Sequence, residues 1–219
     1  MSDPAAPTTG SERVTLRDGS RIAIRPVRPG DKSAIAAGFD RLSPRSRYRR
    51  FFAPLEELSD RDLAYLTEVD HRDHEALIAF HEATGEPVGV VRYIRVSGTT
   101  EAEVAVVVVD DWQGRGIATA LLDRLVDRAR EQGITHFLAL VQTENVEAIR
   151  MFEDFAPTGS ESRRSASGHL ELVIELPAPG TPTDASRLGR ALRAAARGAL
   201  QANPWSVIRE RIRDNRPLR

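Results

Sequence analysis

The chain of 219 residues contains no cysteine. Disulfide bridges, thiolate metal sites and a covalent cysteine intermediate are therefore excluded. Lysine is nearly absent too, since Lys32 is the only lysine among 31 basic residues, and arginine-favouring codon usage explains that bias. The longest aliphatic run, Val104–Val109, is far too short to span a bilayer, and the polar start does not resemble a signal peptide. We therefore expect a cytoplasmic protein with no transmembrane segment.

Acidic and basic residues nearly balance, because the formal net charge is −1. Nothing in that total favours nucleic acid as a partner. The distribution is uneven, however: residues 184–219 carry a net charge of +6, which leaves −7 for the rest. We expect disordered residues at 1–12, one domain at 13–176, a proline-rich linker at 177–183 and an Arg-rich amphipathic helical tail at 184–219.

The pattern of apolar residues predicts an α/β (α+β) domain with a mixed, mostly antiparallel sheet. Strands are predicted at 13–16, 21–27, 76–80, 88–96, 102–109, 135–141 and 169–176. A first helix is predicted from the N-cap candidate Asp31 to about 42, and a second begins at Ser43-Pro44. A third follows a capping box formed by Ser59 and Asp62. Two more are predicted at about 114–132 and at 146–154. An antiparallel meander followed by one strand-helix-strand unit is not the alternation of a doubly wound fold.

A glycine-rich turn, Gln113–Thr119, connects the valine-rich strand to the long helix. Backbone N–H groups at a helix N-terminus bind anions, and Arg115 adds a positive charge. A diphosphate could approach the main chain closely, because side chains are small or absent at Gly114, Gly116 and Ala118. A dinucleotide fingerprint would need glycine at Thr119, and a Walker A loop would need Gly-Lys-Ser/Thr. A simple strand-to-helix turn is the remaining alternative.

Gln113-x-x-Gly116-x-Ala118 resembles the Q/R-x-x-G-x-G/A signature of GNAT acetyltransferases. The run Arg25–Asp31 is similar to the first strand and helix start of that family, and Asn145-x-x-Ala148-x-x-Met151-Phe152 is similar to its last helix. The resemblance extends from about 13 to 176. It implies the GNAT fold, in which helices flank the sheet and a central strand-helix-strand unit holds acyl-CoA.

The same resemblance implies acetyl-CoA as cosubstrate, with no metal. The pyrophosphate would lie on the Gln113–Thr119 turn, and the pantetheine would run between the strands that end near Val109 and Val141. The residues implied to contact the cofactor are Val107, Val109, Gln113, Gly114, Arg115, Gly116, Ala118, Thr119 and Asn145.

Glu103 is the candidate general base, since by resemblance it occupies the position of the base in lysine-acetylating GNATs. Strand alternation places Glu103 on one face with Ala105, Val107 and Val109. The alternative is a solvated glutamate paired with an arginine across the sheet, and Glu101 could replace Glu103 if the register differs. Phe152 stands where many GNATs have a tyrosine that protonates the departing thiolate.

The run Leu42–Phe52, followed by Val69-Asp70-His71, resembles bacterial Pat-type protein lysine acetyltransferases. This resemblance implies a protein substrate, such as the active-site lysine of an acyl-CoA synthetase. Within Leu42–Phe52, the basic-aromatic run Arg45–Phe52 fits an amphipathic helix lining the substrate mouth better than a nucleic-acid surface.

Two alternatives stay open: a small-molecule amine N-acetyltransferase, and an acyl-CoA-binding regulatory module that has lost catalysis. The oligomeric state is also open. His71 and His74 could be metal ligands, but no third ligand is placed near them.

Overall fold

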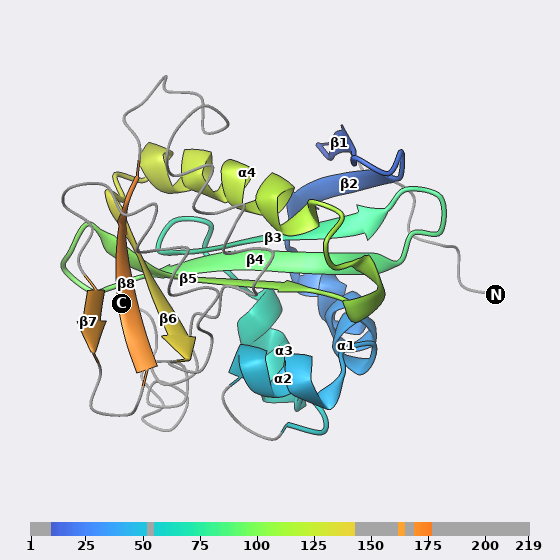
Figure 1. The fold of residues 1–219 in the computed structure, drawn as a ribbon, viewed down its shortest axis with the longest axis horizontal. Coiled ribbons are helices and arrows are strands. Elements are labelled where there is room, and N and C mark those ends of the chain that lie inside the picture. The colour runs from blue at the N-terminus through green and yellow to red at the C-terminus, as the bar shows by residue number, and fades with distance from the viewer. Residues whose placement is uncertain (1–9, 52–54, 143–161, 165–168, 177–219) are drawn as a thin grey trace.

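The computed structural model describes residues 10–51, 55–142, 162–164 and 169–176. Asn145, the helix predicted at 146–154, the linker and the Arg-rich tail lie outside these residues. The described strands form one eight-stranded sheet in the order β1-β2-β3-β4-β5-β6-β8-β7 (Figure 1).

The first five strands form an antiparallel meander. They are β1 (Glu12–Thr15), β2 (Arg21–Pro26), β3 (His74–His81), β4 (Pro87–Arg95) and β5 (Glu101–Val108). Next to β5 lies the parallel strand β6 (His136–Gln142), which pairs antiparallel with β8 (His169–Glu175). The short edge strand β7 (Ser162–Arg164) is not predicted by the sequence. The mixed, mostly antiparallel sheet that the sequence predicts is confirmed.

Helices cover both faces of this sheet (Figure 1). One face carries α4 (Ile117–Glu131), whose Leu121, Leu122 and Leu125 are fully buried against the strands. Burial of one such leucine stabilises the fold by about 1.5–3 kcal/mol. The other face carries α1 (Lys32–Asp40), α2 (Pro44–Phe51) and α3 (Asp60–Thr67). None of the helices in the described part of the chain is long and apolar enough to cross a membrane.

The helix starts predicted at Asp31 and Ser59 are reproduced, with one difference in bonding. Ser59 and Asp62 form the expected capping box of α3. Asp31 is the N-cap residue of α1, but its carboxylate does not bond the first turn of that helix. It pairs instead with Arg25 and accepts the Arg28 N–H at 2.8 Å. This carboxylate therefore closes the 3-10 turn Pro29–Asp31 and fastens it to the end of β2.

The helix predicted to begin at Gly114 begins three residues later, at Ile117. Gly114 and Gly116 have φ angles of 76° and 99°, in the left-handed region that a right-handed helix cannot include. These two residues therefore form a loop that turns the chain into the helix. At the other end Gly133, with a φ of 73°, terminates α4 as predicted.

Strands β5 and β6 pair over a short distance and then separate (Figure 1). Their parallel register joins only Glu101–Glu103 to His136–Leu138. Beyond this point β5 continues beside β4 to Val108, whereas β6 continues beside β8. The two central strands thus diverge directly after Glu103.

Candidate active site

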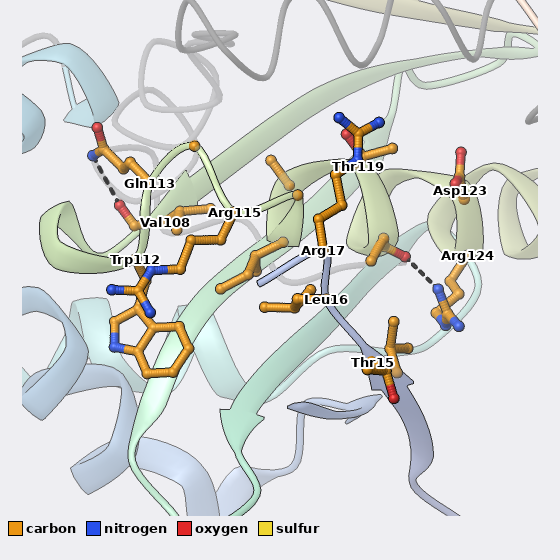
Figure 2. Close-up of a pocket in the computed structure, with 16 residues that line it drawn as sticks. Thr15, Leu16, Arg17, Val108, Trp112, Gln113, Arg115, Thr119, Asp123 and Arg124 are labelled. Carbon is orange, nitrogen blue, oxygen red and sulfur yellow. Dashed lines mark hydrogen bonds between the residues drawn. The ribbon is translucent and has the colours of Figure 1, made fainter. Parts of the chain in front are cut away.

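A cavity of about 410 Å³ lies at the N-terminus of α4, beneath the hairpin that joins β1 and β2. Its lining comes from Val14–Arg17 of the hairpin, from Val108 at the end of β5, from the segment Trp112–Ala120 and from Asp123 and Arg124 of α4 (Figure 2). A volume of this size is typical of small-molecule and cofactor sites. The structure thus brings most of the predicted cofactor residues together around one cavity.

Backbone donors face this cavity at the start of α4. The first intrahelical bond is donated by Ala120 to the Gly116 carbonyl, so the N–H groups of Ile117, Ala118 and Thr119 have no partner within the helix. A Cβ placed at Gly114 or Gly116 would meet no heavy atom within 4 Å. Among the described residues the turn therefore offers both unpaired donors and open space, which is what an anionic group requires.

Arg115 is held in place by three neighbours. Its guanidinium lies 4.5 Å from the ring centroid of Trp112, pairs with Asp18 at 3.3 Å and donates to the Asp111 carbonyl. A hydrogen bond from the Ser20 backbone is the main cause that holds the pKa of Asp18 below its usual range. Arg115 thus connects the tip of the β1–β2 hairpin to the glycine turn, so its charge is shared with Asp18.

Arg17 is a second cation at this cavity, and sequence reasoning missed it. Its side chain extends from the hairpin toward Thr119 (Figure 2). It is exposed and has no hydrogen-bond or ion-pair partner within the described residues. Arg124, by contrast, is bound to Glu12 and to the Ala120 carbonyl. Arg17 is therefore the arginine at this cavity that is available to an anion.

The side chain of Gln113 stabilises the turn. Its side-chain amide donates to the Val108 carbonyl at 3.1 Å, so it ties the turn back to the end of β5 (Figure 2). Val107 and Val109 lie elsewhere: they line a second, mostly apolar cavity of about 50 Å³ on the face of α1–α3. The nine residues implied to contact the cofactor therefore divide between two cavities, with Asn145 outside the described part of the chain.

Glu103 is the last residue of β5 that pairs with β6, and it faces α1–α3. Its neighbours Ala102 and Val104 belong to the core beneath α4, so the alternate residue points to the opposite side. Across the sheet Glu103 stands opposite Ile94, not opposite an arginine. The side chain is half-buried, and its Oε2 atom is withdrawn from solvent. Glu103 thus lies where the two central strands separate.

A buried arginine lies on the same face, two residue pairs along the strands. Arg92 stands between Ala76 and Ala105 in the register of the sheet, and these small neighbours leave room for its side chain. Its guanidinium donates to the Leu66 carbonyl and contacts His74 Nε2 at 3.0 Å. Burial lowers the pKa of Arg92 to about 10, so the group stays charged at neutral pH.

The two histidines considered as metal ligands have other partners. His71 Nδ1 lies 2.8 Å from Glu75 Oε1, and His74 contacts Arg92 as described above. Within the described residues no three histidine or acidic side chains are grouped as a metal site would need.

Comparisons with known proteins agree with this geometry. Residues 42–156 match the acetyltransferase (GNAT) family. The acetyltransferase PA5475 of Pseudomonas aeruginosa is 32% identical over 133 residues, which are 60% of this chain and 72% of that protein. The acetyltransferase Pat of Mycolicibacterium smegmatis is 33% identical over 193 residues, 86% of this chain. The present chain spans only 56% of the length of Pat.

The fold has a close solved counterpart. The crystal structure of the GNAT domain of S. lividans PAT superposes with a TM-score of 0.67 at 36% identity, over 76% of this chain and 97% of that domain. Together with the family match, a helix N-terminus whose first amides have no partner within the helix, beside two diverging strands, identifies an acyl-CoA-dependent transferase. The chain belongs to the acetyltransferase (GNAT) family, and its cosubstrate is acetyl-CoA.

Proposed function

We propose that this enzyme acetylates lysine side chains of proteins and that Glu103 is the general base. Glu103 carries the proposal, because an ionisable carboxylate stands at the point where β5 and β6 separate. The acyl-CoA would lie along this divergence, with its diphosphate on the amides of Gly116–Thr119. The acceptor amine would enter over the opposite face, which α1–α3 cover.

A base is needed because lysine is almost fully protonated at neutral pH. With a free pKa near 10.4, only about one amine in 2,500 is neutral at pH 7, which corresponds to roughly 4.6 kcal/mol. The neutral amine attacks the thioester carbonyl, a C–N bond forms, and the C–S bond breaks to release the CoA thiolate. Glu103 takes the proton that the amine loses. A positioned base of this kind contributes about 10²–10⁴ to the rate.

The preference for a protein acceptor rests on α2. The run that resembles Pat-type enzymes, Leu42–Phe52, contains this helix, and Arg45 and Tyr48 on it are exposed. Tyr48 is the only large apolar side chain that is exposed in the described part of the chain, at 49%. Phe51 of the same helix packs in a cluster with Ile94, the cross-strand neighbour of Glu103. A protein loop that docks on α2 would therefore reach the base.

A labelling experiment tests this proposal. The enzyme is incubated with acetyl-CoA and a host lysate depleted of acetylation, and new modifications are identified by mass spectrometry. We expect new acetyl-lysines on a small set of proteins, absent when the Glu103→Gln variant is used. Acetylated small amines without acetyl-lysine would identify a metabolite N-acetyltransferase. Binding of acetyl-CoA without transfer to either class would identify a regulatory module.

A further inference from the structure

The cofactor turn and the helix beside the acceptor face are joined through one carboxylate. Asp110 follows β5 and opens the 3-10 turn Asp110–Trp112, which leads directly into the glycine turn. Its carboxylate accepts hydrogen bonds from Ser43 N–H, Ser43 Oγ and Ser46 Oγ, each at 2.9 Å. Ser43 and Ser46 belong to the start of α2, more than sixty residues earlier in the sequence.

The bonds are placed so that Asp110 takes part in capping α2. Ser43 Oγ accepts the Ser46 N–H, the position of an N-cap bond, and donates to Asp110 in turn. A negative charge at a helix N-terminus is favourable. Burial raises the pKa of Asp110, but the bonds from Ser43 and Ser46 outweigh this effect and hold that pKa below its usual range. The carboxylate is therefore ionised at neutral pH and keeps all three bonds.

Asp110 is connected to the glycine turn through its backbone and to the acceptor face through α2. On the cofactor side, the Asp110 carbonyl accepts the Gln113 N–H at 3.1 Å, and Gln113 is the first residue of the glycine turn. On the acceptor side, α2 ends at Phe51, whose ring centroid lies 5.4 Å from that of Phe39, in the cluster that also holds Ile94. Direct hydrogen bonds therefore connect the glycine turn to α2, so a displacement of the turn also displaces the start of α2.

We infer that Asp110 is a positioning residue that couples acyl-CoA binding at the glycine turn to the docking of α2 on the acceptor face. Acetyl-CoA fixes the turn, the turn fixes the Asp110 carboxylate, and the carboxylate holds the N-terminus of α2. The inference rests on the proposed function only in taking the α2 face as the acceptor side. Its test uses acetyl-CoA alone, so it is independent of the acceptor.

Hydrogen-deuterium exchange of the α2 amides measures the coupling directly. In the wild-type protein, saturating acetyl-CoA should slow exchange across residues 44–51 by at least about fivefold, the lower end of typical coupling between two sites. In Asp110→Asn the same addition should change exchange by less than about twofold. Calorimetry should show that this variant still binds acetyl-CoA, since the docked form of α2 predominates with or without ligand. A residue that only stabilised α2 would raise its exchange equally in both states.

Two further variants complete the test. Asp111→Asn removes the adjacent exposed carboxylate, and it should keep the wild-type response. The double variant Ser43→Ala/Ser46→Ala removes the two hydroxyl donors from the α2 side, and it should lose the response as Asp110→Asn does. If Asp110→Asn does not fold, this double variant decides. Acetyl-CoA-dependent protection of α2 that survives in these variants, or that is absent from the wild type, would overturn the inference.

Discussion

At the scale of single residues, the arginines around the cavity at the N-terminus of α4 have different partners. Arg115 is engaged with Asp18 and Trp112, and Arg124 with Glu12, whereas Arg17 has no such partner in the described part of the chain. The sequence predicts a positive charge at the turn from Arg115. The structure adds Arg17, which comes from a hairpin about one hundred residues earlier and carries no local signal of this role.

Arg17→Ala should weaken acetyl-CoA binding about fivefold at low ionic strength, because one exposed charge pair contributes up to about 1 kcal/mol. The loss should shrink as salt is added, since the charges are exposed and screened. Arg13→Ala is the matched control: it lies on the same hairpin, but its guanidinium is paired with Glu82. Calorimetry at two salt concentrations measures both variants. Equal affinity of Arg17→Ala and the wild type would remove Arg17 from the site.

Gly116→Asp should abolish the stabilisation that acetyl-CoA confers. At a hundredfold excess over the Kd, a ligand stabilises the fold by about 2.7 kcal/mol. The new carboxylate would stand where the diphosphate is expected. Gly116→Asn controls for backbone strain, because asparagine tolerates a positive φ better than most residues and carries no charge. Thermal unfolding with and without acetyl-CoA separates the two effects, and an unchanged shift in Gly116→Asp would contradict the cofactor placement.

At the scale of secondary-structure elements, the sequence predicts what local patterns determine. The alternation and β-branched residues of 102–109 predict β5, and the capping box at Ser59 predicts the start of α3. Contacts between distant segments have no such pattern. The bond of Ser43 to Asp110 and that of Arg115 to Asp18 join residues 67 and 97 positions apart, so only the packed fold reveals them. The late start of α4 is likewise not predicted by the local pattern, because it depends on the positive φ angles of Gly114 and Gly116.

The Asp110 link should make the stability of α2 depend on pH at the acid end. A carboxylate whose folded-state pKa is depressed stabilises the fold above its unfolded value, near 3.9, and loses this effect as pH falls through the lower folded value. At pH 7 Asp110→Asn should therefore be less stable than the wild type by about 1 kcal/mol, the size of a helix-cap interaction. The difference should vanish once the pH falls below the depressed folded-state pKa of Asp110. Chemical unfolding across a series of pH values from 7 into the acid range checks this, and a difference that is independent of pH would exclude Asp110 as its source.

At the scale of the whole molecule, charge separates the domain from the Arg-rich tail. The tail at 184–219 carries +6 and the remainder −7. Its apolar residues Leu188, Leu192, Ala195 and Ala199 recur at helical spacing, and Trp205, Ile208 and Ile212 follow. These features predict that the tail docks on the catalytic domain. The tail lies outside the described residues, so docking stays a prediction from the sequence.

Removal of the residues after Pro177 should then lower the Tm, by about 2–4 °C for each kcal/mol of lost contact. In the full chain Trp205 should emit at shorter wavelength than a free indole and resist quenching by acrylamide. A truncated protein with an unchanged Tm, together with a freely quenched Trp205, would indicate that the tail serves a partner instead.

In the proposed reaction, Glu103 takes a proton from the amine while acetyl-CoA lies on the turn before α4. The most direct measurement compares Glu103→Gln with Glu101→Gln, a glutamate two residues earlier on the same strand. We expect Glu103→Gln to lower kcat by about 10²–10⁴ at pH 7, to leave the Kd for acetyl-CoA nearly unchanged and to need higher pH to recover its rate. Glu101→Gln should behave as the wild type does. A Glu103→Gln enzyme within about threefold of wild-type kcat, far below the effect of a general base, would contradict the claim.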